Sequence, residues 1–166
     1  KNYSQLLNSS DKPLFNRAIQ GQYPPGSTVK PLFGLIALDN KTVSASTRID
    51  DPGFFVMEGI DRPWRDHNSE RGGHGKGVDL AKAIIESCDV FFYEMGIKTG
   101  INILSSNSSE FGLGAKTGID LPGEAKGIMP SRIWKKENRN ASWFNGDTIN
   151  MSIGQGFMLS TPLQLA

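Results

Sequence analysis

A serine hydroxyl and a lysine amine stand three residues apart in Ser27-Thr28-Val29-Lys30, at the start of an apolar stretch. Residues i and i+3 share one face of a helix. A lysine among apolar neighbours gives up its proton more readily and can serve as the base that activates a serine. The same spacing recurs in Ser9-Ser10-Asp11-Lys12, where the surroundings are polar and the match is a coincidence. On spacing alone, a helix cap followed by a solvent-facing lysine is the favoured interpretation of Ser27 and Lys30.

Four other side chains offer donor atoms for a metal: the carboxylates of Asp51 and Asp66, the imidazole of His74 and the thiol of Cys88. A set of four that mixes oxygen, nitrogen and sulfur is typical of zinc. The spacings are long, so the pattern by itself is weak evidence. The alternatives stay open: Cys88 as a small buried apolar residue, His74 as a loop residue bonded to backbone, and His67 as a competing ligand.

The elements that must position these residues follow from apolar periodicity, turn residues and caps. The stretch 27–38 predicts a buried helix that begins at Ser27 or Thr28, after the rigid turn Pro24-Pro25-Gly26. The other predicted elements are extended segments in 43–58 joined by a turn at Asp51-Pro52-Gly53, a loop over 61–77, helices over 79–86, 90–95 and 97–107, and turn-rich chain over 112–128.

Short polar motifs mark where these elements begin. Asp79 is the expected N-cap of its helix, and Asp89 is the expected N-cap before Val90. Thr161-Pro162 predicts a further helix start. The basic residues Arg132, Lys135, Lys136 and Arg139 are expected to form a solvated face, and Trp64, Trp134 and Trp143 are expected to be packing residues.

The composition is that of an ordinary folded protein of 166 residues, 37% hydrophobic and 21% charged, with a formal charge of +1. The near-neutral balance gives no reason to expect nucleic acid or a membrane surface as partner. The apolar run 31–38 is far shorter than the ~20 residues of a membrane helix, and the lone Cys88 excludes an internal disulfide. Because the sequence begins without methionine and stops one turn into a predicted helix, we expect 1–166 to be a partial domain, with an N-terminal anchor and the C-terminal part of the domain outside it.

A series of short motifs runs in order along nearly the whole chain. They are Pro13-Leu14-Phe15-Asn16-Arg17-Ala18, Tyr23-Pro24-Pro25-Gly26-Ser27-Thr28-Val29-Lys30-Pro31, Gly73-His74-Gly75, the stretch 86–93, the stretch 117–124, the stretch 130–135, Gly146-Asp147-Thr148, Gly154-Gln155-Gly156 and Thr161-Pro162. Together they resemble the transpeptidase domain of class B penicillin-binding proteins, of the elongation (rod-shape) type called penicillin-binding protein 2.

This resemblance implies an α/β (α+β) penicillin-binding fold, with helices around an antiparallel sheet that is truncated before its later strands, and three active-site motifs. It makes Ser27 the nucleophile, Lys30 its base, and Ser87 a carrier of protons between Lys30 and the leaving amine. Asp89 stands where the family has Asn, and an ionised Asp only accepts hydrogen bonds, so a donor role toward the substrate is in doubt. A literal Ser105-Ser106-Asn107 lacks the family's flanking residues and is set aside.

Two segments, Lys98-Thr99-Gly100 and Lys116-Thr117-Gly118, spell the family's third motif. Neither precedes a predicted strand, and the resemblance places the functional copy beyond Ala166. We therefore expect both to be loop residues, and the substrate-binding edge to lie outside this sequence. Whether the chain is active alone stays open.

The implied activity is a serine D,D-transpeptidase that crosslinks peptidoglycan stem peptides (D-Ala-D-Ala) during cell elongation through an acyl-enzyme, with β-lactams acylating the same serine. The implied location is the periplasmic face of the bacterial inner membrane, through an anchor outside this chain. A rod-complex glycan polymerase is the expected partner. No catalytic cofactor is expected. Some elongation-type members look similar at Asp51, Asp66, His74 and Cys88 and hold a structural zinc there, so the resemblance makes these four residues candidate ligands of one. The alternatives are a catalytically silent or β-lactam-sensing scaffold of the same fold, and a β-lactamase.

Overall fold

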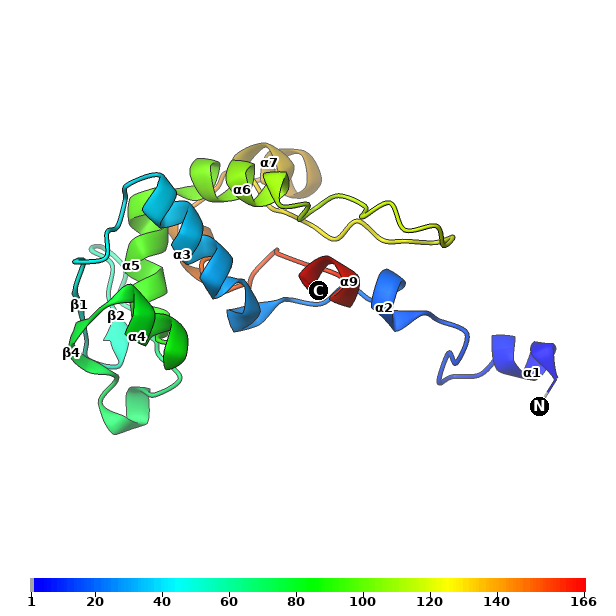
Figure 1. The fold of residues 1–166 in the computed structure, drawn as a ribbon, viewed down its shortest axis with the longest axis horizontal. Helices are drawn as coiled ribbons and strands as arrows, with labels where there is room; N and C mark the ends of the chain where they lie inside the picture. Colours follow the sequence, from blue (N-terminus) through cyan, green and yellow to red (C-terminus); the bar gives the residue numbers. More distant parts are fainter. Residues whose placement is uncertain (1) are drawn as a thin grey trace.

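Two buried helices, α3 (Lys30–Asp39) and α5 (Asp89–Thr99), form the centre of the fold in a computed structural model that describes residues 2–166 (Figure 1). Each buries one broad apolar side and leaves the other at the surface, with Leu35 and Leu38 exposed on α3 and Lys98 exposed on α5. Their fully buried side chains are Phe33, Val90, Phe91, Phe92 and Met95, with Ile36 and Ala37 also in the core. The helices predicted over 27–38 and 90–95 are confirmed, but the burial predicted for 27–38 is wrong in part, because Leu35 and Leu38 lie exposed on one side of α3.

Other helices of four to ten residues surround this pair, and several of them are capped by the side chain of the residue that precedes them. They are α1 (Tyr3–Leu7), α2 (Arg17–Gln20), α4 (Leu80–Ile85), α6 (Ile101–Glu110), α7 (Arg132–Arg139), α8 (Asn145–Met151) and α9 (Pro162–Leu165), with 3₁₀ turns η1 (Gly26–Val29) and η2 (Ser69–Arg71). The side chain of Asp79 accepts from the Lys82 N–H, and that of Thr161 accepts from the Gln164 N–H. Both predicted caps are confirmed.

The strands of the described residues make two small antiparallel pairs. β1 (Ile49–Asp51) pairs with β4 (Gly75–Val78), and β2 (Phe54–Phe55) pairs with β3 (Trp64–Arg65). The mixed helical and antiparallel architecture agrees with the predicted fold class. The loop predicted over 61–77 is wrong in part, because β3, η2 and the start of β4 lie inside it.

Several predicted boundaries differ from the structure for local reasons. The helix that carries Lys30 is preceded by a 3₁₀ turn from Gly26, without a side-chain cap from Ser27 or Thr28. The helix predicted over 97–107 is two helices, because Gly100 takes a φ of +80° between α5 and α6. Lys98 and Thr99 therefore form the last turn of α5 rather than a loop, whereas Lys116-Thr117-Gly118 lies in loop as predicted.

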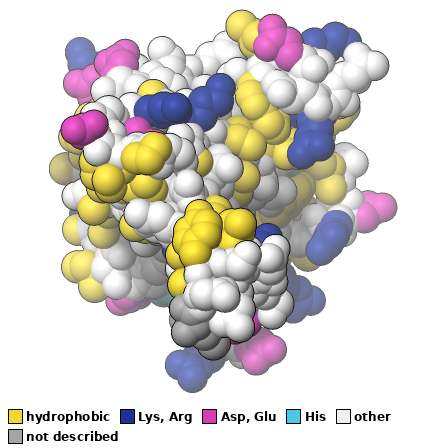
Figure 2. Space-filling view, turned by 90° about the vertical axis from the view of Figure 1, so that its right-hand side faces the viewer, with side chains coloured by type: hydrophobic (Ala, Val, Ile, Leu, Met, Phe, Trp, Pro, Cys, Tyr) yellow, Lys and Arg dark blue, Asp and Glu magenta, His cyan; other side chains and the backbone are white. Residues whose placement is uncertain are grey.

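The molecule has a body and two arms (Figure 1). The body holds α3 to α8 and both strand pairs. One arm is the N-terminal segment with α1 and α2, and the other is the irregular chain over 112–128. α9 lies beside α2, and Tyr23 forms an isolated antiparallel bridge with Ser160. Figure 2 looks at the arms from their far end and shows apolar side chains at the surface there. Among the exposed apolar residues of the N-terminal arm are Tyr3 and Leu7.

Within residues 2–166 the helices are too short and too polar for any of them to cross a bilayer.

Candidate active site

Ser27 lies exposed in the 3₁₀ turn that leads into α3, and the chain on both sides of it is fixed by backbone contacts. The Gly26 N–H donates to the Gly154 carbonyl at 2.9 Å. Gly154 has a φ of +70°, and a Cβ built on it would stand 2.2 Å from the Gly26 oxygen. On the other side, the Thr28 hydroxyl donates to the Pro25 carbonyl at 2.8 Å. The turn leaves the serine hydroxyl accessible while its backbone is held.

Lys30 points from the first position of α3 to the segment between α4 and α5. Its Nζ donates to the Ser87 carbonyl at 2.7 Å, to Ser87 Oγ at 3.1 Å and to Asp89 Oδ1 at 2.6 Å. Ser87 Oγ in turn donates to Ser27 Oγ at 2.8 Å. Lys30 is only 1% exposed, so this chain of hydrogen bonds connects a buried amine to an exposed hydroxyl. A hydroxyl between an amine and a second hydroxyl can pass a proton in either direction.

Ser87 holds a left-handed backbone, with a φ of +57°. This conformation costs a residue with a Cβ about 1–2 kcal/mol. It is imposed by the sharp reversal between α4 and α5, in which the Cys88 N–H returns to the Ala83 carbonyl at 2.9 Å. The strained serine is the one whose carbonyl and hydroxyl both face Lys30, and such outliers gather at functional sites.

The four predicted metal donors come together directly behind this reversal. One donor atom from each of Asp51, Asp66, His74 and Cys88 lies within 4.8 Å of the other three. His74 Nδ1 lies 2.7 Å from Asp51 Oδ2, and Cys88 Sγ donates to the same oxygen at 3.3 Å. A tetrahedral zinc needs donors separated by about 3.3 to 3.8 Å. The Cys88–Asp51 distance of 3.3 Å and the His74–Asp66 distance of 3.6 Å already meet this spacing, and the His74–Asp51 pair would move apart slightly to hold the ion.

Burial and charge also fit a cation. Asp51 and Asp66 are 1% and 2% exposed, and among the described residues their ion-pair partners are histidines. Buried carboxylates without a permanent positive partner are costly. Burial raises the pKa of Asp51, but hydrogen bonds from His74, Gly53 and Cys88 outweigh it, so the net pKa is lowered. Burial, together with the nearby Asp51 charge, raises the pKa of the Cys88 thiol.

The cluster is joined to the serine–lysine pair through backbone groups. Asp66 Oδ2 accepts from the Asp89 N–H at 2.6 Å, and Cys88 Sγ accepts from the Phe91 N–H at 3.4 Å. Cys88, rather than the predicted Asp89, is therefore the N-cap of α5. Asp89 is the first residue of that helix, and its carboxylate accepts a hydrogen bond from Lys30 Nζ.

The other candidates are placed apart or in lesser roles. His67 Nδ1 lies 3.2 Å from Asp66 Oδ1, but its side chain is 54% exposed, whereas that of His74 is 4% exposed. Ser105-Ser106-Asn107 lies within α6, and Ser9 and Lys12 lie in the N-terminal arm.

Sequence reasoning missed two features. The expected solvated face is wrong for Lys135, which is 6% exposed and pairs with Asp147 at 2.6 Å, with the rings of Trp143, Phe144 and Phe157 around its amine. The sequence names Gly154 only as part of the motif Gly154-Gln155-Gly156, without a structural role. Its contact with Gly26 joins residues far apart in sequence, so the sequence offered only the unusual density of glycine as a signal.

The family profile described as "Penicillin binding protein transpeptidase domain" matches residues 1–166. "Peptidoglycan D,D-transpeptidase MrdA" of Acinetobacter baumannii is 46% identical over 166 residues, which is 100% of this chain and 24% of that protein. The protein of the same name from Escherichia coli (strain K12) is 42% identical over 166 residues, which is 100% of this chain and 26% of that protein.

Solved structures of penicillin-binding proteins are similar to this chain over nearly its whole length. Pseudomonas aeruginosa PBP2 in complex with WCK 5153 superposes with a TM-score of 0.93 at 44% identity, over 98% of this chain and 35% of that one. The Helicobacter pylori complex between penicillin-binding protein PBP2 and MreC superposes with a TM-score of 0.90 at 42% identity, over 98% of this chain and 30% of that one. The chain spans about a quarter of the length of the curated relatives it matches.

Proposed function

Because the chain belongs to the family of penicillin-binding protein transpeptidase domains, we propose that it carries the reactive serine of a peptidoglycan D,D-transpeptidase of the elongation type. The substrate class is the stem peptide that ends in D-Ala-D-Ala. The observation that supports this best is the chain of hydrogen bonds from Lys30 Nζ through Ser87 Oγ to Ser27 Oγ. Two relatives that are 46% and 42% identical to this chain carry the name peptidoglycan D,D-transpeptidase.

In the first half-reaction, Ser27 Oγ attacks the carbonyl carbon between the two D-alanines. Its proton passes to Ser87 Oγ as the proton of Ser87 passes to Lys30 Nζ in its neutral form. The C–N bond then breaks, and the same relay returns the proton to the departing amine nitrogen of D-alanine. The products are an ester on Ser27 and free D-alanine.

In the second half-reaction, an amine of a neighbouring stem peptide attacks the ester carbonyl. Its proton leaves through Ser87 to Lys30, the C–O bond breaks, and Ser27 Oγ is protonated again. One peptide bond has been broken and one formed, so no external energy source is needed. A β-lactam would acylate Ser27 by the first half-reaction, with the ring amide in place of the peptide bond.

Asp89 acts on Lys30 in this scheme rather than on the substrate. Its Oδ1 lies 2.6 Å from Lys30 Nζ, and its side chain is 14% exposed. A carboxylate only accepts hydrogen bonds. We therefore assign Asp89 to orienting the Lys30 amine toward Ser87.

We further propose that Asp51, Asp66, His74 and Cys88 hold a structural zinc ion. The mixed donor set, its burial and its two uncompensated carboxylates support this assignment. When bound, the ion would supply positive charge and tie the β1–β4 pair to the reversal at Ser87. Binding requires the Cys88 thiol to lose its proton.

The intact protein would act at the periplasmic face of the inner membrane, within a wall-synthesis complex. One structural relative is titled as a complex of PBP2 with MreC, and another as a peptidoglycan synthase complex that coordinates polymerization and crosslinking. By analogy, a scaffold protein or a glycan polymerase of the elongation machinery is the expected partner.

The test is the intact mass of the full-length protein that contains this chain after incubation with a penicillin, because the substrate-binding edge is expected to lie beyond residue 166. Wild type gains one adduct, Ser27→Ala gains none, and Ser9→Ala gains one, because Ser9 shares the sequence spacing but not the site. An adduct on Ser27→Ala, or none on wild type, would refute the proposal. Release of D-alanine from a pentapeptide donor separates a transpeptidase from a silent or β-lactam-sensing scaffold, and steady hydrolysis of the penicillin would indicate a β-lactamase.

A further inference from the structure

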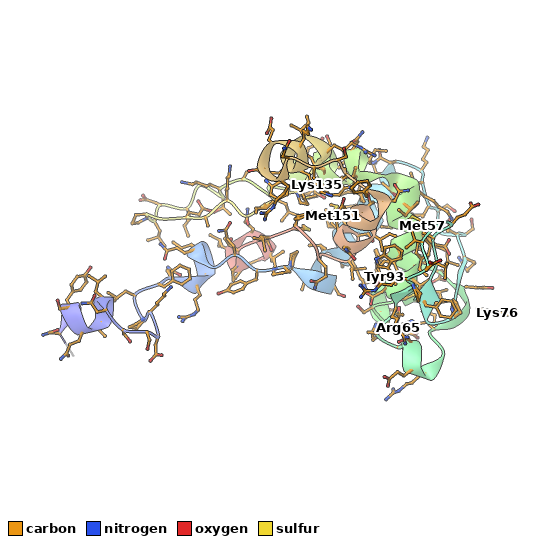
Figure 3. The ribbon with its side chains drawn as sticks, turned by 180° about the vertical axis from the view of Figure 1, so that it is seen from behind. Met57, Arg65, Lys76, Tyr93, Lys135 and Met151 are labelled. Carbon is orange, nitrogen blue, oxygen red and sulfur yellow. The ribbon has the colours of Figure 1, made fainter. Side chains whose placement is uncertain are left out.

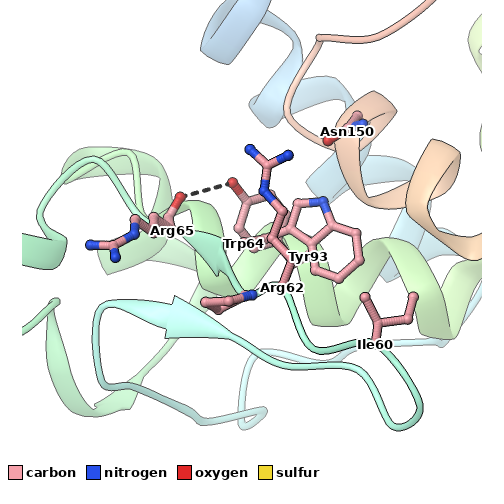
Figure 4. Close-up of a pocket in the computed structure, with 7 residues that line it drawn as sticks. Ile60, Arg62, Trp64, Arg65, Tyr93 and Asn150 are labelled. Carbon is pink, nitrogen blue, oxygen red and sulfur yellow. Dashed lines mark hydrogen bonds between the residues drawn. The ribbon is translucent and has the colours of Figure 1, made fainter.

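A pocket of about 700 Å³ lies beside the candidate active site, between the segment that leads into β3, helix α5 and helix α8 (Figure 4). Its walls are Ile60, Arg62, Pro63, Trp64, Arg65, Tyr93 and Asn150. Its size falls within the range of small-molecule and peptide subsites, about 300–1,000 Å³. None of these residues takes part in the serine–lysine relay or in the metal cluster.

The pocket walls are positively charged. Two arginines line the pocket, and no acidic side chain does. Figure 4 shows the Arg62 guanidinium pointing to the side on which Asn150 lies, whereas the Arg65 guanidinium points away from it. Arg62 and Asn150 are both exposed, so their donors are available to a ligand.

The aromatic wall of the pocket is rigid and neutral. Tyr93 is 4% exposed, and its hydroxyl donates to the Arg65 carbonyl at 3.2 Å. Figure 3 shows Tyr93 and Arg65 close together on the body of the molecule. Burial, and then the charges of Asp89 and Asp66, raise the pKa of Tyr93. The phenol therefore adds no negative charge that would repel an anion.

Each wall of the pocket contains a residue that lies close in sequence to a group in contact with Lys30, with the Asp89 backbone or with the turn before Ser27. Tyr93 lies one helical turn after Asp89 on the same face of α5, and Asp89 holds Lys30. Asn150 lies four residues before Gly154, whose carbonyl accepts from the residue preceding Ser27. Arg65 precedes Asp66, which accepts from the Asp89 N–H. These contacts tie all three walls of the pocket to the elements that hold Lys30 and Ser27.

We propose that this pocket binds a side-chain or α-carboxylate of the stem peptide, with Arg62 as its principal donor. This inference rests on the proposed function and adds to it the feature of the substrate that is recognised. A guanidinium donates two parallel hydrogen bonds to a carboxylate and remains charged at any working pH. Asn150 donates to peptide carbonyls, and Trp64 covers the apolar part of the ligand.

The experiment measures kcat/KM for crosslinking by the intact protein with matched peptides. One donor carries its free internal carboxylates and another carries them as amides, and the acceptor is varied in the same way. Wild type prefers one of the free acids over its amide by about tenfold or more, the value of a hydrogen bond to a charged group. Whether the donor or the acceptor shows the preference identifies the source of the carboxylate.

Arg62→Gln brings that ratio close to one, mainly through KM, while Arg132→Gln, an exposed arginine on α7, keeps it. Equal use of acid and amide by wild type would overturn the proposal, as would an undiminished preference in Arg62→Gln. A fall of both rates by the same factor would also overturn it, because Arg62 would then only support the fold. Penicillin acylation of wild type is measured beside these rates. Its absence refutes the serine chemistry itself and this inference with it.

Discussion

The contact between Gly154 and Gly26 gives a sharp test of how Ser27, the proposed nucleophile, is positioned. In Gly154→Ala, the new Cβ would stand 2.2 Å from the Gly26 oxygen and 2.7 Å from its nitrogen. Real Cβ contacts essentially never fall under 3.0 Å, so the Gly26 backbone must retreat by about 0.8 Å. Gly26 directly precedes Ser27 in the 3₁₀ turn, so the serine moves with it.

Gly156→Ala is a matched control. Gly154 and Gly156 have φ values of +70° and +74°, so alanine costs each position the same left-handed strain, about 1–2 kcal/mol. At Gly156 the new Cβ would meet only Asn150 Cβ at 3.4 Å, an ordinary contact. The difference between the two variants therefore isolates the displacement of Gly26.

A misplacement of about 1 Å at a reacting group costs roughly 100-fold in rate, which corresponds to about 2.7 kcal/mol of transition-state stabilisation. We expect Gly154→Ala to form the penicillin adduct about 100-fold more slowly than Gly156→Ala. The assay is time-resolved intact mass, with urea unfolding run beside it to confirm that both variants are folded. Equal acylation rates in the two folded variants would refute the positioning argument.

Three further predictions concern the metal cluster, the relay and the loop over 117–124. Elemental analysis should find about one zinc per chain in wild type and in His67→Ala, and none in Cys88→Ser. The latter should lose about 3 kcal/mol of stability, because two buried carboxylates are left uncompensated; a metal-free wild type of equal stability would contradict this. Ser87→Ala should slow adduct formation by about 100-fold with folding intact, and a change of less than threefold would exclude Ser87 from the relay. Hydrogen bonds from the Thr117 hydroxyl and N–H lower the pKa of Glu124 below its ordinary 4.5. Since the folded pKa is below the unfolded one, this stabilisation is present above pH 4.5 and is lost as pH falls through the folded pKa. The protection factor of the Thr117 amide should drop over that window in wild type and stay flat in Glu124→Gln.

The central helices could be predicted from sequence because their signals are local. The spacing of apolar residues over 27–38 indicates a helix without knowledge of its neighbours, and α3 lies where it predicts, although Leu35 and Leu38 are exposed rather than buried. Asp79 and Thr161 act as caps through bonds to residues three positions away. The family resemblance, given by motifs in order, is likewise confirmed by the profile match and the relatives.

Features that depend on distant partners could not be predicted in this way. β3 and β4 are too short to show an alternating pattern and exist because they pair with β2 and β1. Lys135 belongs to a strongly charged run, and only its pairing with Asp147 and the surrounding rings shows that it is buried. The left-handed Ser87 follows from the geometry of two helices that meet at an angle, which no propensity of serine indicates.

The sequence predicted which residues come together at the candidate site, but it did not predict the contacts that join them. Motif and resemblance selected Ser27, Lys30 and Ser87, and the structure brings all three together. The four metal donors are spread over 38 positions, from Asp51 to Cys88, and their approach within 4.8 Å results from the β1–β4 pair and the turn before α5. The prediction that Asp89 is the N-cap of α5 was wrong, because Cys88 occupies that position. The Asp89 carboxylate pairs with Lys30 instead.

The carboxylates near Lys30 connect the proposed metal cluster to the proposed serine–lysine chemistry. Asp51, Asp66 and Asp89 put three carboxylates in one buried region, and Lys30 pairs with the last of them. Asp66 Oδ2 accepts from the Asp89 N–H, so the position of Asp66 sets the direction in which the Asp89 carboxylate meets Lys30. A divalent ion on Asp51 and Asp66 would remove the repulsion that otherwise pushes these groups apart. The zinc proposed here would thus act on the orientation of the base two contacts away, and its loss should slow acylation as well as lower stability.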